Sequence, residues 1–143
     1  MAYDPSRIGI PRSVLELLGI VFVRFRPVPR AWAAWLVAVN SASVLFLSHV
    51  EARVALGAVG PALLAQALIY RRRRFIRLLG VTHVLWVPML AWIASRLGEV
   101  PGDDAAFRAW LLALVATNAV SLAIDAYDAI RYLRGERAPH YAW

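Results

Sequence analysis

Three polar residues, two of them ionisable, lie near the same ends of long apolar stretches: Gln66, His83 and Asp125. Each is about one or two helical turns from an arginine-rich boundary. Ionisable residues inside a membrane are costly and mark functional sites by default, and a histidine beside a carboxylate can relay protons or bind a polar headgroup. In the structural alternative, Asp125 reaches the membrane surface to pair with Arg131 or an arginine of the 71–74 block, and His83 bonds to a backbone carbonyl.

A second polar pair, Asn40 and Asn118, falls near the middle of two other apolar stretches. Their equal depth predicts an interhelical hydrogen bond, which contributes about 0.6–2 kcal/mol in a membrane. We interpret this pair as structural, with contact to a substrate as the alternative.

Metal and cofactor chemistry finds little support. Asp125 and Asp128 share a helical face and could hold a cation on a lipid phosphate, but Arg131 one turn away favours an Asp–Arg helix-end pair. His49 is expected at the outer boundary of the bilayer and His83 in its inner leaflet, so one haem iron cannot reach both. The chain has no cysteine, and no nucleotide-binding, zinc or nucleophile motif is present. We therefore expect no catalytic residues, no metal and no cofactor.

The elements that must position these residues are long and apolar. Hydrophobic residues make up 61% of the 143, and the mean hydropathy is +0.58. Apolar stretches that can cross a bilayer as helices are expected at about residues 31–47, 49–70, 75–96 and 104–134. Local signals predict where these helices begin and end: Pro29, a Ser48–Glu51 capping box, a left-handed Gly98, an Asp103 cap and Gly135. Pro61 and Pro88 should each kink a helix near its middle.

Residues 1–30 form an N-terminal segment with its own short helix. Ser13 and Glu16 make a capping-box pattern, and apolar residues then recur at helical spacing as far as Phe25. About a dozen residues are too few to span a bilayer. With Arg24, Arg26 and Pro27 at its end, this helix should lie on the membrane surface; the alternative is a helix packed under the bundle.

All sixteen basic residues are arginine, and the net charge is +7. The arginines lie at the ends of apolar stretches, which excludes a nucleic-acid-binding face and instead indicates topology. Thirteen fall on one side of the expected bilayer and three on the other. This asymmetry predicts an inner-membrane protein with both the N-terminus and the tail 135–143 in the cytoplasm. The inner surface could also bind anionic lipids, through Arg24, Arg26, Arg30, Arg71, Arg72, Arg73, Arg74 and Arg77.

The sequence thus predicts an all-α integral membrane four-helix bundle preceded by a short interfacial amphipathic helix. Small residues recur every four positions at Ala34, Ala38 and Ala42, at Ala58 and Ala62, and at Ala109 and Ala113. Such seams allow helices to approach closely, within the bundle or with a partner. The favoured function is a non-enzymatic accessory or scaffold subunit that binds other membrane subunits or copies of itself. A small oligomeric transporter or channel is the alternative, and a lipid-modifying enzyme the third.

Overall fold

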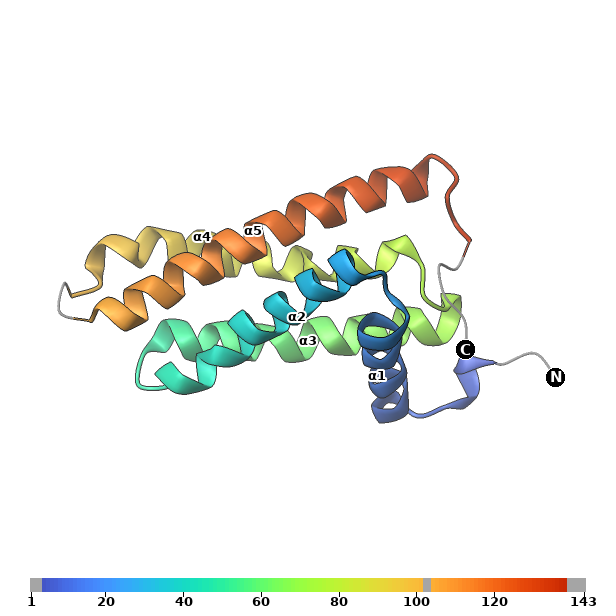
Figure 1. The fold of residues 1–143 in the computed structure, drawn as a ribbon, viewed down its shortest axis with the longest axis horizontal. Helices are drawn as coiled ribbons and strands as arrows, with labels where there is room; N and C mark the ends of the chain where they lie inside the picture. Colours follow the sequence, from blue (N-terminus) through green and yellow to red (C-terminus); the bar gives the residue numbers. More distant parts are fainter. Residues whose placement is uncertain (1–3, 102–103, 139–143) are drawn as a thin grey trace.

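The computed structural model describes residues 4–101 and 104–138, and its regular structure is helical (Figure 1). Five α-helices follow one another: α1 (Ile10–Gly19), α2 (Pro27–Ser41), α3 (Val50–Arg73), α4 (Trp86–Arg96) and α5 (Ala105–Leu133). Tighter 3₁₀ segments are η1 (Pro5–Arg7), η3 (Ala42–Phe46), η4 (Arg77–Leu85) and η5 (Leu97–Glu99), and η2 (Ile20–Arg24) is a π-helical turn. The all-α expectation is confirmed for the described residues.

Three helical segments are long and apolar enough to cross a membrane: Val50–Arg73, Arg77–Glu99 and Ala105–Leu133. The stretch expected at 31–47 is not among them, so three of the four expected spans are found. There α2 ends after 15 residues and continues as the 3₁₀ segment η3. One cause is visible at the junction, where the Ser43 hydroxyl donates to the carbonyl of Asn40 at 2.6 Å and competes with the regular helical pattern.

Neither predicted capping box forms. α1 begins at Ile10, with Pro11 in its first turn, and Ser13 lies inside the helix, where its hydroxyl donates to Gly9 O at 3.0 Å. α3 begins after His49 without a side-chain cap. The glutamates of both boxes have distant partners instead, Tyr70 for Glu16 and Arg96 for Glu51.

The ends of α4 and α5 also differ from expectation. Gly98 is not left-handed, because α4 continues into η5; among the described glycines only Gly135 has a positive φ, at 110°. Asp104 caps α5 by accepting from the Phe107 amide at 3.2 Å. Asp103, which was expected in that role, lies outside the described residues.

The third span opens with nine residues of 3₁₀ helix, which is long for this conformation. It begins at Arg77, two residues later than expected, and becomes α-helical only at Trp86. Pro88 consequently lies in the first turn of α4, where its missing amide is tolerated. The kink expected at this position stays a prediction. Pro61 does lie inside α3.

α1 crosses the end of α3 instead of running along it (Figure 1). Leu17 and Ile20 pack against Ala67, Tyr70 and Leu79 in a small apolar cluster of their own. The Tyr70 hydroxyl donates to Glu16 at 3.0 Å and fixes α1 to α3. The N-terminal helix therefore packs against α3, and its expected position at a membrane surface stays a prediction.

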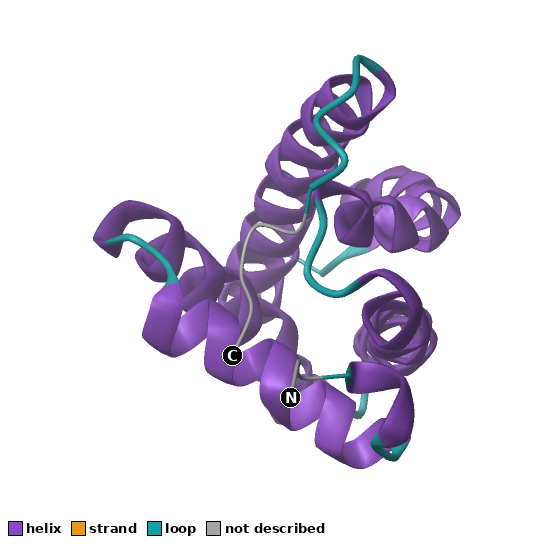
Figure 2. Ribbon diagram, turned by 90° about the vertical axis from the view of Figure 1, so that its right-hand side faces the viewer, coloured by secondary structure: helices purple, strands orange, loops and turns teal. Residues whose placement is uncertain are grey.

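The main core lies between α3, α4 and α5, with α2 covering part of it. Its fully buried members include Ile93, Leu111 and Leu114. η1, the α3–η4 turn and the C-terminal end of α5 all lie at one end of the molecule, and Figure 2 is viewed from that end. We call it the arginine end because Arg71, Arg72 and Arg73 form the end of α3 there and Arg74 begins the turn that follows.

The turn at the arginine end contains a strained residue. Arg74 has φ 62° and ψ −160°, a region that is essentially restricted to glycine. Arg74→Gly should therefore raise the free energy of unfolding by about 1 kcal/mol. Denaturant unfolding in mixed micelles would measure this change. Arg73→Gly, within the last turn of α3, is the control and should lower stability by up to about 1 kcal/mol; a loss of stability in both variants would contradict the account.

Candidate functional site

Gln66, His83 and Asp125 come from α3, η4 and α5 and form one hydrogen-bonded chain. Gln66 Nε2 lies 2.9 Å from His83 Nε2, and His83 Nδ1 lies 2.7 Å from Asp125 Oδ2. The alternative partners expected from the sequence do not apply, because Asp125 pairs with His83 and Arg131 pairs with Glu136. The structure thus joins three residues that the sequence only placed at similar depth.

The 3₁₀ geometry of η4 explains how His83 reaches α5. Residues three apart are eclipsed in a 3₁₀ helix, so Arg77, Gly80, His83 and the adjoining Trp86 share one face. The Trp86 ring stacks on His83 at 4.1 Å between centroids, and its Nε1 donates to Ala58 O at 3.4 Å. This row of four was missed from the sequence, although the spacing of three could have shown it.

Gly80 provides the space for the carboxylate. A Cβ atom at position 80 would overlap the carboxyl group of Asp125, so only glycine allows η4 and α5 to approach this closely. The side chains of His83 and Asp125 are 13% and 18% exposed. The site is therefore enclosed by Gly80, Trp86 and the two facing helices.

The two contacts fit one tautomer of a neutral His83 ring. With its amide nitrogen donating, Gln66 requires an unprotonated Nε2 on the ring. The ring proton then lies on Nδ1 and is donated to Asp125. Polar side chains on three helical elements are thus joined through a single imidazole.

A second set of charges lies one turn nearer the arginine end. Arg77 binds Asp128 at 2.7 Å and Glu136 at 3.0 Å, and Arg131 binds Glu136 at 2.7 Å. The hydrogen bond from Arg131, with Arg77 adding to it, lowers the pKa of Glu136. The expected pairing of Asp128 with Arg131 is replaced by Arg77. Asp125 and Asp128 thus have different partners and do not converge on one point.

Asn40 and Asn118 meet as the sequence predicted. Asn40 Nδ2 donates to Asn118 Oδ1 at 3.0 Å, and Asn118 Nδ2 donates to Asn40 Oδ1 at 3.2 Å, with both residues buried. One turn away, Trp35 Nε1 donates to Thr117 Oγ1 at 3.0 Å. These bonds join α2 to α5.

Asn118→Leu should lower the free energy of unfolding by about 1–2 kcal/mol, because it leaves the side-chain oxygen of Asn40, Oδ1, without its donor. Unfolding in mixed micelles would measure this loss. The double variant Asn40→Leu/Asn118→Leu should lose less than the sum of the two single variants. Strictly additive losses would contradict the predicted bond.

The arginines expected to meet lipid headgroups differ from one another in their contacts within the chain. Arg30 donates to the carbonyls of Val23 and Phe25 at 2.9 and 2.7 Å, and Arg71 to that of Ser6 at 3.0 Å. Arg77 is in the ion pairs already described, and Arg74 forms the strained turn. Arg24, Arg26, Arg30, Arg72 and Arg73 are exposed.

Comparison of the chain with protein-family models, with curated proteins and with solved structures finds no match. Its function has to be inferred from its own residues.

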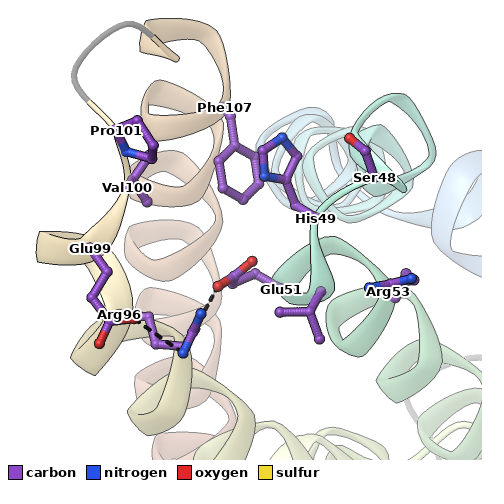
Figure 3. Close-up of a pocket in the computed structure, with 10 residues that line it drawn as sticks. Ser48, His49, Glu51, Arg53, Arg96, Glu99, Val100, Pro101 and Phe107 are labelled. Atoms are coloured by element: carbon purple, nitrogen blue, oxygen red, sulfur yellow. Dashed lines mark hydrogen bonds and ion pairs between the residues drawn. The ribbon is translucent and has the colours of Figure 1, made fainter.

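At the opposite end, a pocket of about 350 Å³ opens between the start of α3 and the α4–α5 connection (Figure 3). Arg96 crosses it to bind Glu51 at 2.6 Å and Glu99 at 3.1 Å. His49 stacks on Phe107 at 3.7 Å and lies 3.2 Å from Asp104. No spacing signal in the sequence indicated this network, whose members come from three separate segments.

Proposed function

We propose that this chain is a non-enzymatic accessory or scaffold subunit of a larger inner-membrane protein assembly. The observation that carries the proposal is that the polar residues within the helices bond to one another. Asn40 binds Asn118, and Gln66, His83 and Asp125 form a closed chain. Residues used in this way hold helices together, as interhelical hydrogen bonds do in membranes.

The outer surface of α2 supports the same proposal. Ala34 and Ala38 are exposed, and Trp35 between them is 52% exposed. Ala34 and Ala38 are therefore not used for packing within the bundle. In contrast, Ala42 of the same seam packs against the main core, and Ala62 of the α3 seam is buried. Small residues on a lipid-facing surface allow another helix to approach closely.

A fourth span completes the proposed topology. α2 and η3 together form the additional crossing, because Asn40 near the end of α2 meets Asn118 in the middle of α5. The distribution of arginine then places both chain ends in the cytoplasm of an inner membrane. α1 would lie at the cytoplasmic surface with Leu15 exposed towards lipid. Arg24, Arg26, Arg72 and Arg73 would face anionic headgroups there.

The test is purification of the tagged chain, expressed at its native level, after mild solubilisation. We expect it to co-purify in fixed stoichiometry with a larger membrane complex. Ala34→Leu/Ala38→Leu should release it from that complex, because the bulkier side chains hold the partner helix away. Ala119→Leu, on an exposed position of α5, is the matched control and should leave the complex intact. Recovery of the wild-type chain only as a monodisperse homo-oligomer would contradict the proposal.

A small oligomeric transporter or channel is the second candidate. The observation in its favour is the continuous Gln66–His83–Asp125 chain, which could line a path together with Asn40 and Asn118. A flux assay in liposomes tests this alternative. Unchanged transport after His83→Ala and Asp125→Asn would exclude a role for the chain in the path. A lipid-modifying enzyme has less support, because Asp125 and Asp128 bind different partners.

A further inference from the structure

We propose that Gln66, His83 and Asp125 form a site inside the membrane that binds one proton. This inference goes beyond a scaffold role, since a purely structural hydrogen-bonded chain needs no change of protonation. It rests on the two ring contacts of His83, on the Asp125 carboxylate beside the ring and on the Gln66 amide, which has both a donor and an acceptor.

Both ring nitrogens of His83 are engaged, so the histidine can gain a proton without losing either partner. In the neutral ring, Nδ1–H donates to Asp125 and Nε2 accepts from Gln66. Protonation forms an N–H bond at Nε2, with the proton supplied by water at the membrane surface. The Gln66 amide then turns over, and its oxygen accepts from the new donor.

The surrounding charges favour uptake of one proton. From α5 and the segment after it, Asp125, Asp128 and Glu136 are negative and Arg131 is positive; from η4, Arg77 is positive. The residues that α3 contributes, Gln66 and Tyr70, are neutral. The Tyr70 hydroxyl donates to Glu16 of α1, and Glu16 also forms an ion pair with Arg12. With neutral His83 the His83–Asp125 pair has a net charge of −1, and with charged His83 it has none.

An unbalanced charge in a low-dielectric region is far more costly than a bonded pair. The Asp125 carboxylate is 2.7 Å from the ring, and the Trp86 face lies against it at 4.1 Å between centroids. An aromatic face stabilises a cation. The groups that contact His83 therefore all accommodate a charged ring.

The test uses the full chain in lipid nanodiscs, with histidine labelled with ¹⁵N and observed by NMR between pH 9 and pH 5. His83→Gln identifies the His83 signals among those of the three histidines. At high pH we expect neutral His83 with its proton on Nδ1, opposite to the Nε2–H form that free histidine favours. As the pH falls, His83 should become doubly protonated in a single step while the chain stays folded.

Asp125→Asn should lower the proton affinity of His83 at least about tenfold, because the opposite charge is lost. Asp104→Asn, which removes the matching carboxylate beside His49 at the far end, should leave His83 unchanged. If a variant does not fold, the position of the ring proton on neutral His83, measured in the wild-type chain, still tests the proposal. A neutral His83 protonated on Nε2, no uptake of a proton within the folded range, or an unchanged affinity in Asp125→Asn would each overturn the proposal.

Discussion

His83→Leu is expected to lower the free energy of unfolding by about 2–4 kcal/mol. The substitution leaves the Asp125 carboxylate beside Gly80 without its hydrogen-bond donor, and Leu cannot bond to Gln66. The loss should be somewhat below that of a fully buried ion pair, because the Asp125 side chain is 18% exposed. The measurement is unfolding of the purified chain in mixed micelles, followed by the helical circular dichroism signal.

Two further variants distinguish this cause from general loss of packing. His83→Leu/Asp125→Leu removes the unpaired carboxylate as well and should recover at least half of the lost stability. His49→Leu breaks the more exposed pair with Asp104 at the other end and should cost less than about 1 kcal/mol. A His83→Leu chain as stable as His49→Leu would show that the His83 bonds contribute little.

Gly80→Ala is expected to lower the free energy of unfolding by about 1–3 kcal/mol, the usual cost of overpacking. A single methyl group at position 80 would overlap the Asp125 carboxyl and separate η4 from α5. The same mixed-micelle unfolding measures this effect. Loss of the His83–Asp125 contact should accompany it, visible as a changed ¹⁵N signal of the His83 ring.

Gly57→Ala in α3 is the matched control, because a Cβ atom there has no neighbour within 4 Å. Alanine is the better helix former, so this variant should be neutral or stabilised by up to about 1 kcal/mol. If the two glycine variants were equally stable, the close approach at Gly80 would not be required.

The depth of polar residues could be predicted from the sequence, because it depends only on counting along helices from the arginine-rich ends. That counting predicted the contact between Asn40 and Asn118 and placed Gln66, His83 and Asp125 at a similar depth. Which atoms bond depends on helix phase, and here the assumption of α-helical spacing was wrong. Nine 3₁₀ residues rotate Arg77 towards Asp128, a pairing that α-helical phase assigned to Arg131.

Helix starts were predicted less well, because a capping box requires a glutamate that is free to bend back. Glu16 and Glu51 are instead held by Tyr70 and Arg96, which lie 54 and 45 residues away in the chain. Such tertiary partners are not visible in a local pattern. The early end of α2 has a local origin instead, because the Ser43 hydroxyl donates to the backbone carbonyl of Asn40.

The proposed topology, in which the chain crosses the bilayer four times with the arginine end in the cytoplasm, can be tested directly. The chain has no cysteine, so single substitutions can be labelled with a membrane-impermeant thiol reagent without background. Arg26→Cys, Arg72→Cys and Glu136→Cys should react only in inverted vesicles, whereas Ser48→Cys and Glu99→Cys should react only in right-side-out vesicles. Labelling of positions 26 and 48 from the same side would contradict the account, because α2 and η3 would then not cross the membrane.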